Sequence, residues 1–329
     1  MVHPIPPGSI AAGQIECDPV ALVTAILPLR HFHEPFLRAA LRSLFHQTSA
    51  AWELVVVVEP EDRDGFLAIL AGELLDHRVR MIGNSGAGLA GAVNSGMRAA
   101  RTPFVAILLG DDAWETDAVA ILDDAIRAWP DVDFFHSGRR VVDENDLPLG
   151  DPFPARETFR IEEFPDGSPV KHLLCWRRDF GLLVGGLDES LRSVGPDDYD
   201  FPWVMAEQGA LFRAIPRCLY VYRDHRESYR LTTHQTLEHH ACEIDRILTK
   251  HGVPESTRRT IVARAERGYL RQCLYRDEAD REAKRRDGWD PRSGWREDYR
   301  APRHRGWRAW LHRSHWRHLL AGLFGRPDA

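Results

Sequence analysis

The chain has 329 residues, of which 43% are hydrophobic and 28% charged, and its formal net charge is −6. This composition excludes an intrinsically disordered chain and a protein that binds nucleic acid through its whole surface, so no nucleic-acid partner is expected. It is compatible with one large domain that carries an appendage.

The five cysteines stand singly, and no CxxC pair occurs. This spacing excludes a zinc knuckle and gives no disulfide framework, which favours a reducing, cytoplasmic compartment. Residues 1–19 lack the charged and apolar segments of a signal peptide, so we expect a loose lead-in. No run approaches the roughly 18 apolar residues of a membrane span.

Short apolar runs alternate with helical patterns over the first 135 residues. Strands are predicted at 21–27, where Pro28 ends the run, and at 54–58, 79–82, 104–109 and 132–135. Helices are predicted at 34–47, 66–75, 89–100 and 117–129. Strands that alternate with helices of about a dozen residues are joined by right-handed crossovers into a mostly parallel sheet.

The pattern changes after residue 135. Residues 136–175 are irregular, a helix is predicted near 201–208, and a last strand is predicted at 219–222. From 236 onward the sequence is helical and charged. We therefore expect an α/β domain over 20–235 and a helical C-terminal extension over 236–329.

A glycine motif follows the third predicted strand. Gly86, Gly88 and Gly91 form GxGxxG at the start of a helix, which is the pattern of a dinucleotide-binding turn. That motif normally opens the first unit of a sheet, but two strand-helix units precede it here. A dinucleotide-dependent oxidoreductase is the alternative that it leaves open.

Seven motifs in order resemble the family 2 glycosyltransferases, which have the GT-A fold. They span about residues 20–230 and lie at 24–28, 41–48, 52–59, 91–96, 106–112, 185–189 with 197–200, and 222–225. The resemblance implies a GT-A-like, mostly parallel sheet flanked by helices and a transfer from a nucleotide sugar with inversion. The sequence departs from the family pattern at Val58, Val93 and Leu109, which leaves open a related module that only binds.

Two adjacent carboxylates follow the fourth predicted strand. Cleavage of a sugar–diphosphate bond builds negative charge on the leaving group, and a divalent cation held by carboxylates neutralises it. Asp111 and Asp112 stand at the carboxyl end of a parallel strand, where α/β sheets bind ligands. We expect Mn²⁺ or Mg²⁺ there, with His225 as a third ligand implied by the resemblance. The alternative is an acidic turn that precedes a helix.

The remaining donor contacts are expected around the ends of the first strands. The resemblance implies donor binding by Pro28, Leu29, Arg30, Glu59, Gly88, Asn94 and Asp111. Glu59 is expected to accept a hydrogen bond from the nucleobase or ribose.

The acceptor hydroxyl needs a base, and an acidic cluster is available for this role. Asp198 resembles the catalytic position of the family, with Asp197 beside it and Asp200 nearby. Neighbouring carboxylates raise one another's pKa values when they are close in space. A helix-capping acidic cluster is the alternative.

The C-terminal tail is basic and rich in tryptophan. Half of the ten tryptophans lie in it: Trp289, Trp295, Trp307, Trp310 and Trp316. An apolar stripe with helical spacing, mixed with arginines, suits a peripheral contact with the inner face of an anionic membrane. Packing on protein is the alternative. The expected acceptor is a glycan, a lipid-linked molecule or a small molecule.

Overall fold

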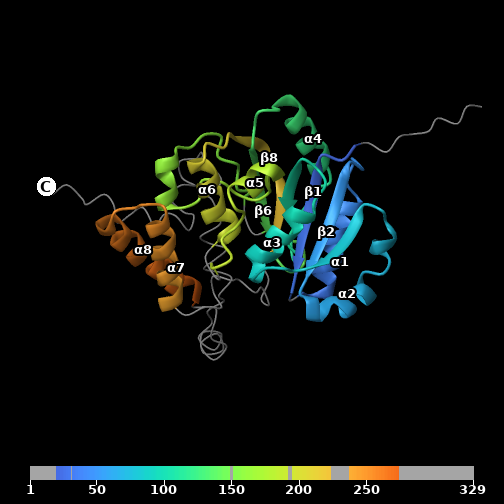
Figure 1. The fold of residues 1–329 in the computed structure, drawn as a ribbon, viewed down its shortest axis with the longest axis horizontal. Helices are drawn as coiled ribbons and strands as arrows, with labels where there is room; N and C mark the ends of the chain where they lie inside the picture. Colours follow the sequence, from blue (N-terminus) through green and yellow to red (C-terminus); the bar gives the residue numbers. More distant parts are fainter. Residues whose placement is uncertain (1–19, 31, 149–150, 192–194, 224–236, 274–329) are drawn as a thin grey trace, which may run out of the picture.

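The computed structural model describes residues 20–30, 32–148, 151–191, 195–223 and 237–273. Its centre is an eight-stranded sheet with the order β3-β2-β1-β4-β7-β6-β8-β5. Helices cover both faces of the sheet, and α7 and α8 lie at the end opposite to α1 and α2 (Figure 1).

The first four strands of the chain pair in parallel and form one half of the sheet, here called the parallel half. They are β1 (Val23–Leu29), β2 (Trp52–Val58), β3 (Val79–Gly83) and β4 (Phe104–Ile107). The connecting helices are α1 (Glu34–Phe45), α2 (Arg63–Ile69) and α3 (Gly88–Ala99). The strand-helix order predicted for this half is confirmed, with boundary differences of a few residues.

Strand β1 continues through Pro28, and the prediction that it ends at Leu27 is wrong. Proline has no N–H to donate to a neighbouring strand. The Ile26 carbonyl accepts from Leu108 on the β4 side at 3.0 Å, and β4 ends opposite Ile26. The proline ring therefore faces the side where the β1–β4 ladder has stopped, while β2 still pairs with β1 on the other side.

The other half of the sheet, here called the mixed half, contains antiparallel pairs. Its strands are β7 (Leu174–Arg177), β6 (Phe134–Val142), β8 (Phe212–Arg223) and β5 (Ala113–Trp114). Strands β5 and β7 were not predicted from sequence, and β8 begins seven residues before the predicted 219. Short strands and a strand that contains Pro216 carry weak local patterns, and pairing with neighbours decides them.

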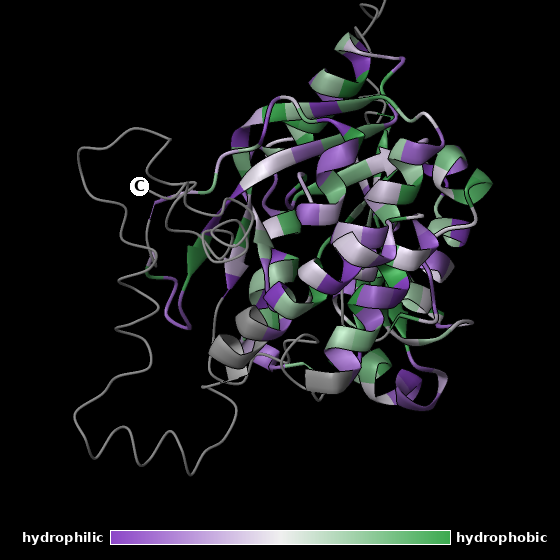
Figure 2. Ribbon diagram, turned by 90° about the vertical axis from the view of Figure 1, so that its left-hand side faces the viewer, coloured by the Kyte–Doolittle hydropathy of each residue, from purple (hydrophilic) through white to green (hydrophobic). Residues whose placement is uncertain are grey.

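The helices of the second half are short. In the mixed half they are α4 (Ala118–Ala128), α5 (Arg178–Leu183), α6 (Phe201–Glu207) and the turn η3 (Ile161–Asp166), and the turns η1 (Pro60–Asp62) and η2 (Glu73–Leu75) flank α2 in the parallel half. A π-helical turn, η4 (Pro196–Asp200), leads directly into α6. Hydrophilic and hydrophobic segments alternate along the surface helices (Figure 2), as expected for helices that bury one face.

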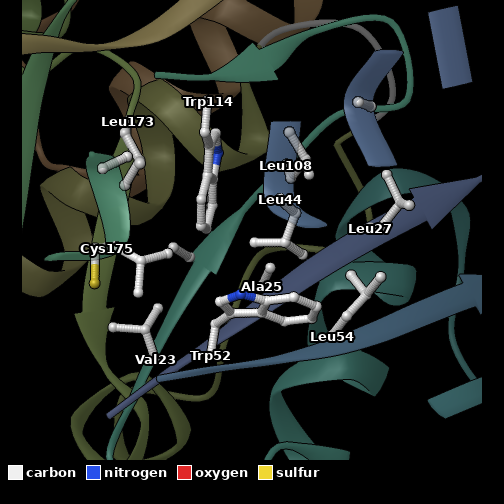
Figure 3. Packing of buried hydrophobic residues seen from close by; sticks show 14 of the residues in the cluster. Val23, Ala25, Leu27, Leu44, Trp52, Leu54, Leu108, Trp114, Leu173 and Cys175 are labelled. Carbon is white, nitrogen blue, oxygen red and sulfur yellow. The ribbon is translucent and has the colours of Figure 1, made fainter. Parts of the chain in front are cut away.

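Two apolar clusters cover the two faces of the sheet. On one face, Val23, Ala25 and Leu27 of β1 pack with Trp52 and Leu54 of β2 (Figure 3). On the other face, Ile26 packs with residues of β2 and α3. Successive side chains of a strand point to opposite faces, so an unbroken apolar run fills both clusters.

Two C-terminal helices complete the described fold. They are α7 (Leu237–Lys250) and α8 (Glu255–Cys273). A third apolar cluster joins Ile247 and Leu248 of α7 to Phe164 of η3 and Trp203 of α6. None of the helices in the described part of the chain is long and apolar enough to cross a membrane. The predicted domain boundary near 235 and the tail beyond 273 lie outside the described residues.

Candidate active site

The carboxyl ends of the parallel strands meet at one edge of the sheet. Leu29 pairs with Val58, and Val58 pairs with Gly83, so these three strands end in register. A Cβ on Gly110 would lie 2.9 Å from a Leu29 methyl, so the segment after β4 reaches the same edge. Ligands of open α/β sheets bind at such edges.

The predicted donor residues of β1 lie at this edge with different exposures. Pro28 is half-buried, Leu29 is buried against the core, and Arg30 is exposed just after the strand. Only Arg30 therefore presents a free polar side-chain surface among these three. Their predicted contacts with a donor remain a prediction.

Glu59 is held at the end of β2 by a neighbouring strand end. The Nδ2 group of Asn84 donates to its Oε1 at 3.1 Å, and Asn84 is buried. The Oδ1 atom of Asn84 also accepts from the Gly86 N–H at 2.9 Å. The carboxylate of Glu59 is therefore fixed in direction at the edge where a nucleobase or ribose is expected.

Asp111 and Asp112 follow β4 but have different environments. Asp111 is half-buried, and its main-chain carbonyl accepts from Nε of Arg223 at 3.0 Å. Asp112 is only 1% exposed, and its two oxygens accept from the Tyr220 hydroxyl at 2.7 Å and the Arg223 N–H at 2.8 Å. Asp112 thus ties the end of β8 to the end of β4.

Burial, and secondly the charge of Asp111, raises the pKa of Asp112 well above its ordinary value. Its two oxygens already have protein donors, which favours a supporting role for Asp112 over the direct metal contact suggested by sequence. Among the described residues, no cluster of three or more His, Cys, Asp or Glu side chains could hold a metal. The third expected ligand, His225, lies outside the described residues.

Gly88 and Asn94 belong to the start and middle of α3. Gly88 has a φ of +64°, a conformation that glycine adopts without strain. Asn94 is 3% exposed, and its Nδ2 donates to the Leu187 carbonyl at 3.0 Å and to Glu189 Oε1 at 2.9 Å. Its Oδ1 accepts from the Leu187 N–H at 2.8 Å. The amide of Asn94 is therefore engaged in joining α3 to the 185–191 loop.

The glycine motif is packed against protein atoms. A Cβ on Gly86 would lie 2.5 Å from Glu189 Oε2, and a Cβ on Gly91 would lie 2.4 Å from the Gly86 carbonyl carbon. Glu189 Oε2 also accepts from the Ala87 N–H at 2.9 Å, at the N-terminus of α3. A carboxylate occupies the position where a dinucleotide would place its pyrophosphate. This geometry speaks against the oxidoreductase alternative.

The departures at Val58 and Val93 are explained by packing. Val58 belongs to one apolar cluster and Val93 to the other, and both are fully buried. Leu109 packs at the border of the second cluster. Apolar side chains at these positions extend the core beneath the edge.

The acidic turn lies on η4, within the mixed half. Asp197 is buried, and its Oδ2 lies 3.3 Å from Nε2 of His172, while Asp198 is half-buried. A Cβ on Gly195 would lie 2.2 Å from Asp198 Oδ1, so a larger residue at this position would require that carboxylate to move. Burial, followed by the charge of Asp197, raises the pKa of Asp198.

A chain of contacts joins the two acidic segments. The Tyr220 hydroxyl contacts Asp112, the Tyr220 ring lies 5.1 Å from the His172 ring, and His172 contacts Asp197. The ends of β4 and β8 and the η4 turn thus lie side by side. Asp112 and Asp197 are about 85 residues apart in sequence.

Two cations near the acidic turn were not identified from sequence. The guanidinium of Arg139 lies over the Tyr222 ring at 5.0 Å, and its Nε is buried without a hydrogen-bond partner. Burial, and secondly Arg139, lowers the pKa of Lys171 to about 8. Both cations reduce the pKa increase of Asp198. Neither belongs to a local motif, so only the strand pairing reveals them.

Comparisons with known proteins agree with this architecture. Residues 24–176 match the family described as Glycosyl transferase family 2. The O-antigen biosynthesis protein RfbC of Myxococcus xanthus is 27% identical over 209 residues, covering 62% of this chain and 16% of RfbC. The chain therefore spans a small part of that relative.

A second relative matches over more of its own length. The Escherichia coli protein UDP-Glc:alpha-D-GlcNAc-diphosphoundecaprenol beta-1,3-glucosyltransferase WfgD is 27% identical over 195 residues, covering 59% of this chain and 69% of WfgD. Among solved structures, the mannosyltransferase PcManGT from Pyrobaculum calidifontis, in complex with GDP-Man and Mn²⁺, has a TM-score of 0.50 at 18% identity. That match covers 92% of this chain and 86% of PcManGT. The predicted GT-A-like fold, a mostly parallel sheet flanked by helices, is confirmed.

Proposed function

We propose that this chain, whose residues 24–176 match glycosyl transferase family 2, transfers a sugar from a nucleotide-sugar donor to an acceptor hydroxyl, with inversion and with the assistance of a divalent cation. The observation that carries the proposal is the contact chain from Asp112 through Tyr220 and His172 to Asp197. It brings the carboxylate after β4 close to the acidic turn. A donor and an acceptor bound at these two places would be near enough to react.

The donor lies along the carboxyl edge of the parallel half in this proposal. Glu59, fixed by Asn84, accepts from the nucleoside, and Arg30 is exposed for an anionic group. Pro28 and Gly88 line the approach in this proposal, Leu29 supports the edge from the core, and Asn94 acts through the loop that it holds. WfgD is named as a UDP-Glc transferase and PcManGT was solved in complex with GDP-Man, so donors with either nucleotide are candidates.

Asp111 is the residue that would hold a divalent cation. Mg²⁺ or Mn²⁺ commonly takes one or two carboxylates, with waters and substrate phosphates completing its coordination. The chemistry of Asp111 fits such a site, since its half-buried carboxylate stands at the strand end while Asp112 is engaged behind it. The cation would supply positive charge for the leaving diphosphate.

Asp198 is the proposed base that accepts the proton of the acceptor hydroxyl. A base works best when its pKa approaches the working pH, and burial with Asp197 nearby shifts Asp198 in that direction. In this proposal the acceptor hydroxyl beside Asp198 attacks the sugar carbon from the side opposite the diphosphate. Attack from that side inverts the configuration of the sugar.

The acceptor and the membrane contact are further proposals. WfgD is named for a diphosphoundecaprenol acceptor, so a lipid-linked acceptor is one candidate beside a glycan or a small molecule. A cytoplasmic location with the basic tail at the inner face of the membrane would suit such an acceptor. The tail lies outside the described residues, and vesicle binding by the full chain against a chain truncated after 273 is the measurement that decides.

Nucleotide binding tests the proposed function directly. The purified chain is titrated with UDP, GDP and NAD, each with and without Mn²⁺. Binding of UDP or GDP that strengthens with Mn²⁺ supports a metal-assisted glycosyltransferase. Binding of NAD without binding of UDP or GDP would support the oxidoreductase alternative. Binding of none of the three nucleotides would contradict the proposal.

A further inference from the structure

The end of α7 contacts the acidic turn through two consecutive residues. Nζ of Lys250 lies 2.8 Å from Asp200 Oδ2, and Nε2 of His251 lies 3.1 Å from Asp200 Oδ1. Asp200 is 1% exposed, so both oxygens of a buried carboxylate are occupied from one helix end. Asp200 closes the η4 turn that carries Asp198.

His251 is fixed by three further features of its surroundings. Its side chain is fully buried and stacks on the Trp203 ring at 3.9 Å with an interplanar angle of 5°. Its Nδ1 lies 2.9 Å from Glu207 Oε1 but outside hydrogen-bond geometry, so Glu207 acts on the ring through charge. Trp203 and Glu207 belong to α6, which continues from η4. The imidazole therefore joins the turn to the helix that follows it.

The same face of α7 also contacts the 185–191 loop. Lys250 Nζ lies 3.2 Å from Asp188 Oδ2, and Arg246 donates to the Ser190 hydroxyl at 2.9 Å. Glu189, which lies between Asp188 and Ser190, accepts a hydrogen bond at the N-terminus of α3. One helix outside residues 24–176 thus contacts both the η4 turn and the 185–191 loop.

We propose that His251, assisted by Lys250, is a positioning residue that sets the direction of the Asp198 carboxylate through Asp200. This inference rests on the proposed function. A π-helical turn is rare and commonly occurs at functional sites, and here contacts from α7 act on its last residue. A displacement of about 1 Å at a catalytic group can lower a rate by about 10²-fold.

The residue types in this contact indicate that it orients Asp200 and does not mainly hold α7 in place. Leu248 and Ile247 already anchor α7 on Trp203 and Phe164 through apolar contacts. Buried charged pairs add little stability compared with apolar packing, because removing charges from water is costly. They do fix direction, since each carboxylate oxygen of Asp200 meets one donor.

The experiment compares two substitutions of His251 with a control on the same helix. His251→Leu removes the donor to Asp200, whereas His251→Gln keeps an amide N–H at a similar reach. His239→Gln is the control, since His239 pairs with Glu243 at 3.4 Å away from the turn. For each variant, nucleoside diphosphate release from UDP-glucose and GDP-mannose gives kcat and KM, UDP or GDP titration gives Kd, and thermal unfolding gives Tm.

We expect His251→Leu to lower kcat about 10-fold or more, with the nucleotide Kd within twofold of the wild type. His251→Gln should recover most of kcat, and the control should match the wild type. Equal kcat values for His251→Leu and the wild type would overturn the inference. So would a parallel loss of kcat and nucleotide affinity, or equal kcat values for the Leu and Gln variants.

A second substitution covers the case in which His251→Leu does not fold. Lys250→Met, at a partly exposed residue, removes the other donor to Asp200 and should lower kcat by about threefold or more without changing Kd. The double variant Lys250→Met with Asp200→Asn should then have the same kcat as Asp200→Asn alone, because Lys250 acts through the Asp200 carboxylate. Additive losses would contradict the inference.

Failure of this inference is distinct from failure of the proposed function. If Asp198→Asn retains turnover, the proposed base is wrong. If Asp198→Asn loses turnover but His251→Leu and Lys250→Met do not, the base stands and only the positioning role is contradicted.

Discussion

The two halves of the sheet are held by different kinds of contact. In the parallel half, mostly apolar strands fill the clusters on both faces, and the polar groups of the proposed donor site lie at the strand ends. In the mixed half, buried polar groups cross between elements, as Asp112 does to β8 and His172 does to Asp197. The difference teaches that the first half is organised by local hydrophobic pattern and the second by long-range polar pairing.

This contrast divides the expected effects of substitution. Changes at the strand-end carboxylate of the parallel half should act on donor and metal binding. Changes at the acidic turn of the mixed half should act on turnover. Changes at the polar contacts between the halves should act on stability.

Removal of the divalent cation should have the largest effect. Excess chelator should lower turnover by about 10³-fold or more, because charge neutralisation at the leaving group supplies several kcal/mol. Asp111→Ala should weaken UDP or GDP binding mainly when Mn²⁺ is present. Turnover assays and nucleotide titrations with and without Mn²⁺ measure both effects. Full activity in excess chelator would contradict the role of Asp111.

Asp198→Asn should lower turnover by at least about 10²-fold, equivalent to about 2.7 kcal/mol in the barrier. The asparagine keeps size and most hydrogen bonding but cannot accept the proton. Donor affinity should remain close to that of the wild type, since the donor edge belongs to the other half. Asp197→Asn is the matched comparison and should cost less. Loss of donor binding along with turnover would break the proposed division between the halves.

Asn94→Ala should lower the free energy of unfolding by about 2–4 kcal/mol. It leaves the buried N–H and carbonyl of Leu187 without their partner, and each unsatisfied group costs about 1–3 kcal/mol. Denaturant unfolding measures the change, and Asn145→Ala at an exposed position is the control, expected within about 0.5 kcal/mol. A loss no larger than that of the control would show that α3 does not depend on this contact.

The mixed half should also make stability depend on pH. Burial lowers the pKa of His136 on β6 to about 4, whereas an unfolded histidine titrates near 6.5. Between these values the unfolded chain binds a proton that the folded chain does not, so this contribution is complete above pH 6.5 and declines as pH falls toward 4. From pH 7.5 to 5 the loss is about 2 kcal/mol, at about 1.36 kcal/mol per pH unit.

His136→Gln should remove this share of the pH dependence. Denaturant unfolding of both proteins at pH 7.5 and pH 5 measures it, above the range in which most carboxylates titrate. Burial also lowers the pKa of His240 on α7 to about 4. If the stability of His136→Gln still falls between pH 7.5 and pH 5, His240→Gln measures the part that His240 contributes. An unchanged slope in His136→Gln would contradict the prediction.

The sequence by itself determined the order of strands and helices in the parallel half and the position of its carboxyl edge, where the proposed donor site lies. The apolar runs at β1, β2 and β4 are stronger than any competing local pattern, and Asp111 follows β4 after three residues. It also carried the resemblance to the family that residues 24–176 match, because seven motifs keep their order along the chain.

Only the tertiary structure decided what the polar residues of that pattern contact. Asn94 and Glu189 are 95 positions apart, and Asp200 and His251 are 51 apart, so no local periodicity connects them. Arg139 and Lys171 carry no motif, and β5 and β7 are too short to show a strand pattern before they pair. Hydrophobic burial is encoded by each segment alone, whereas the direction of a buried hydrogen bond is fixed only when both partners have been brought together.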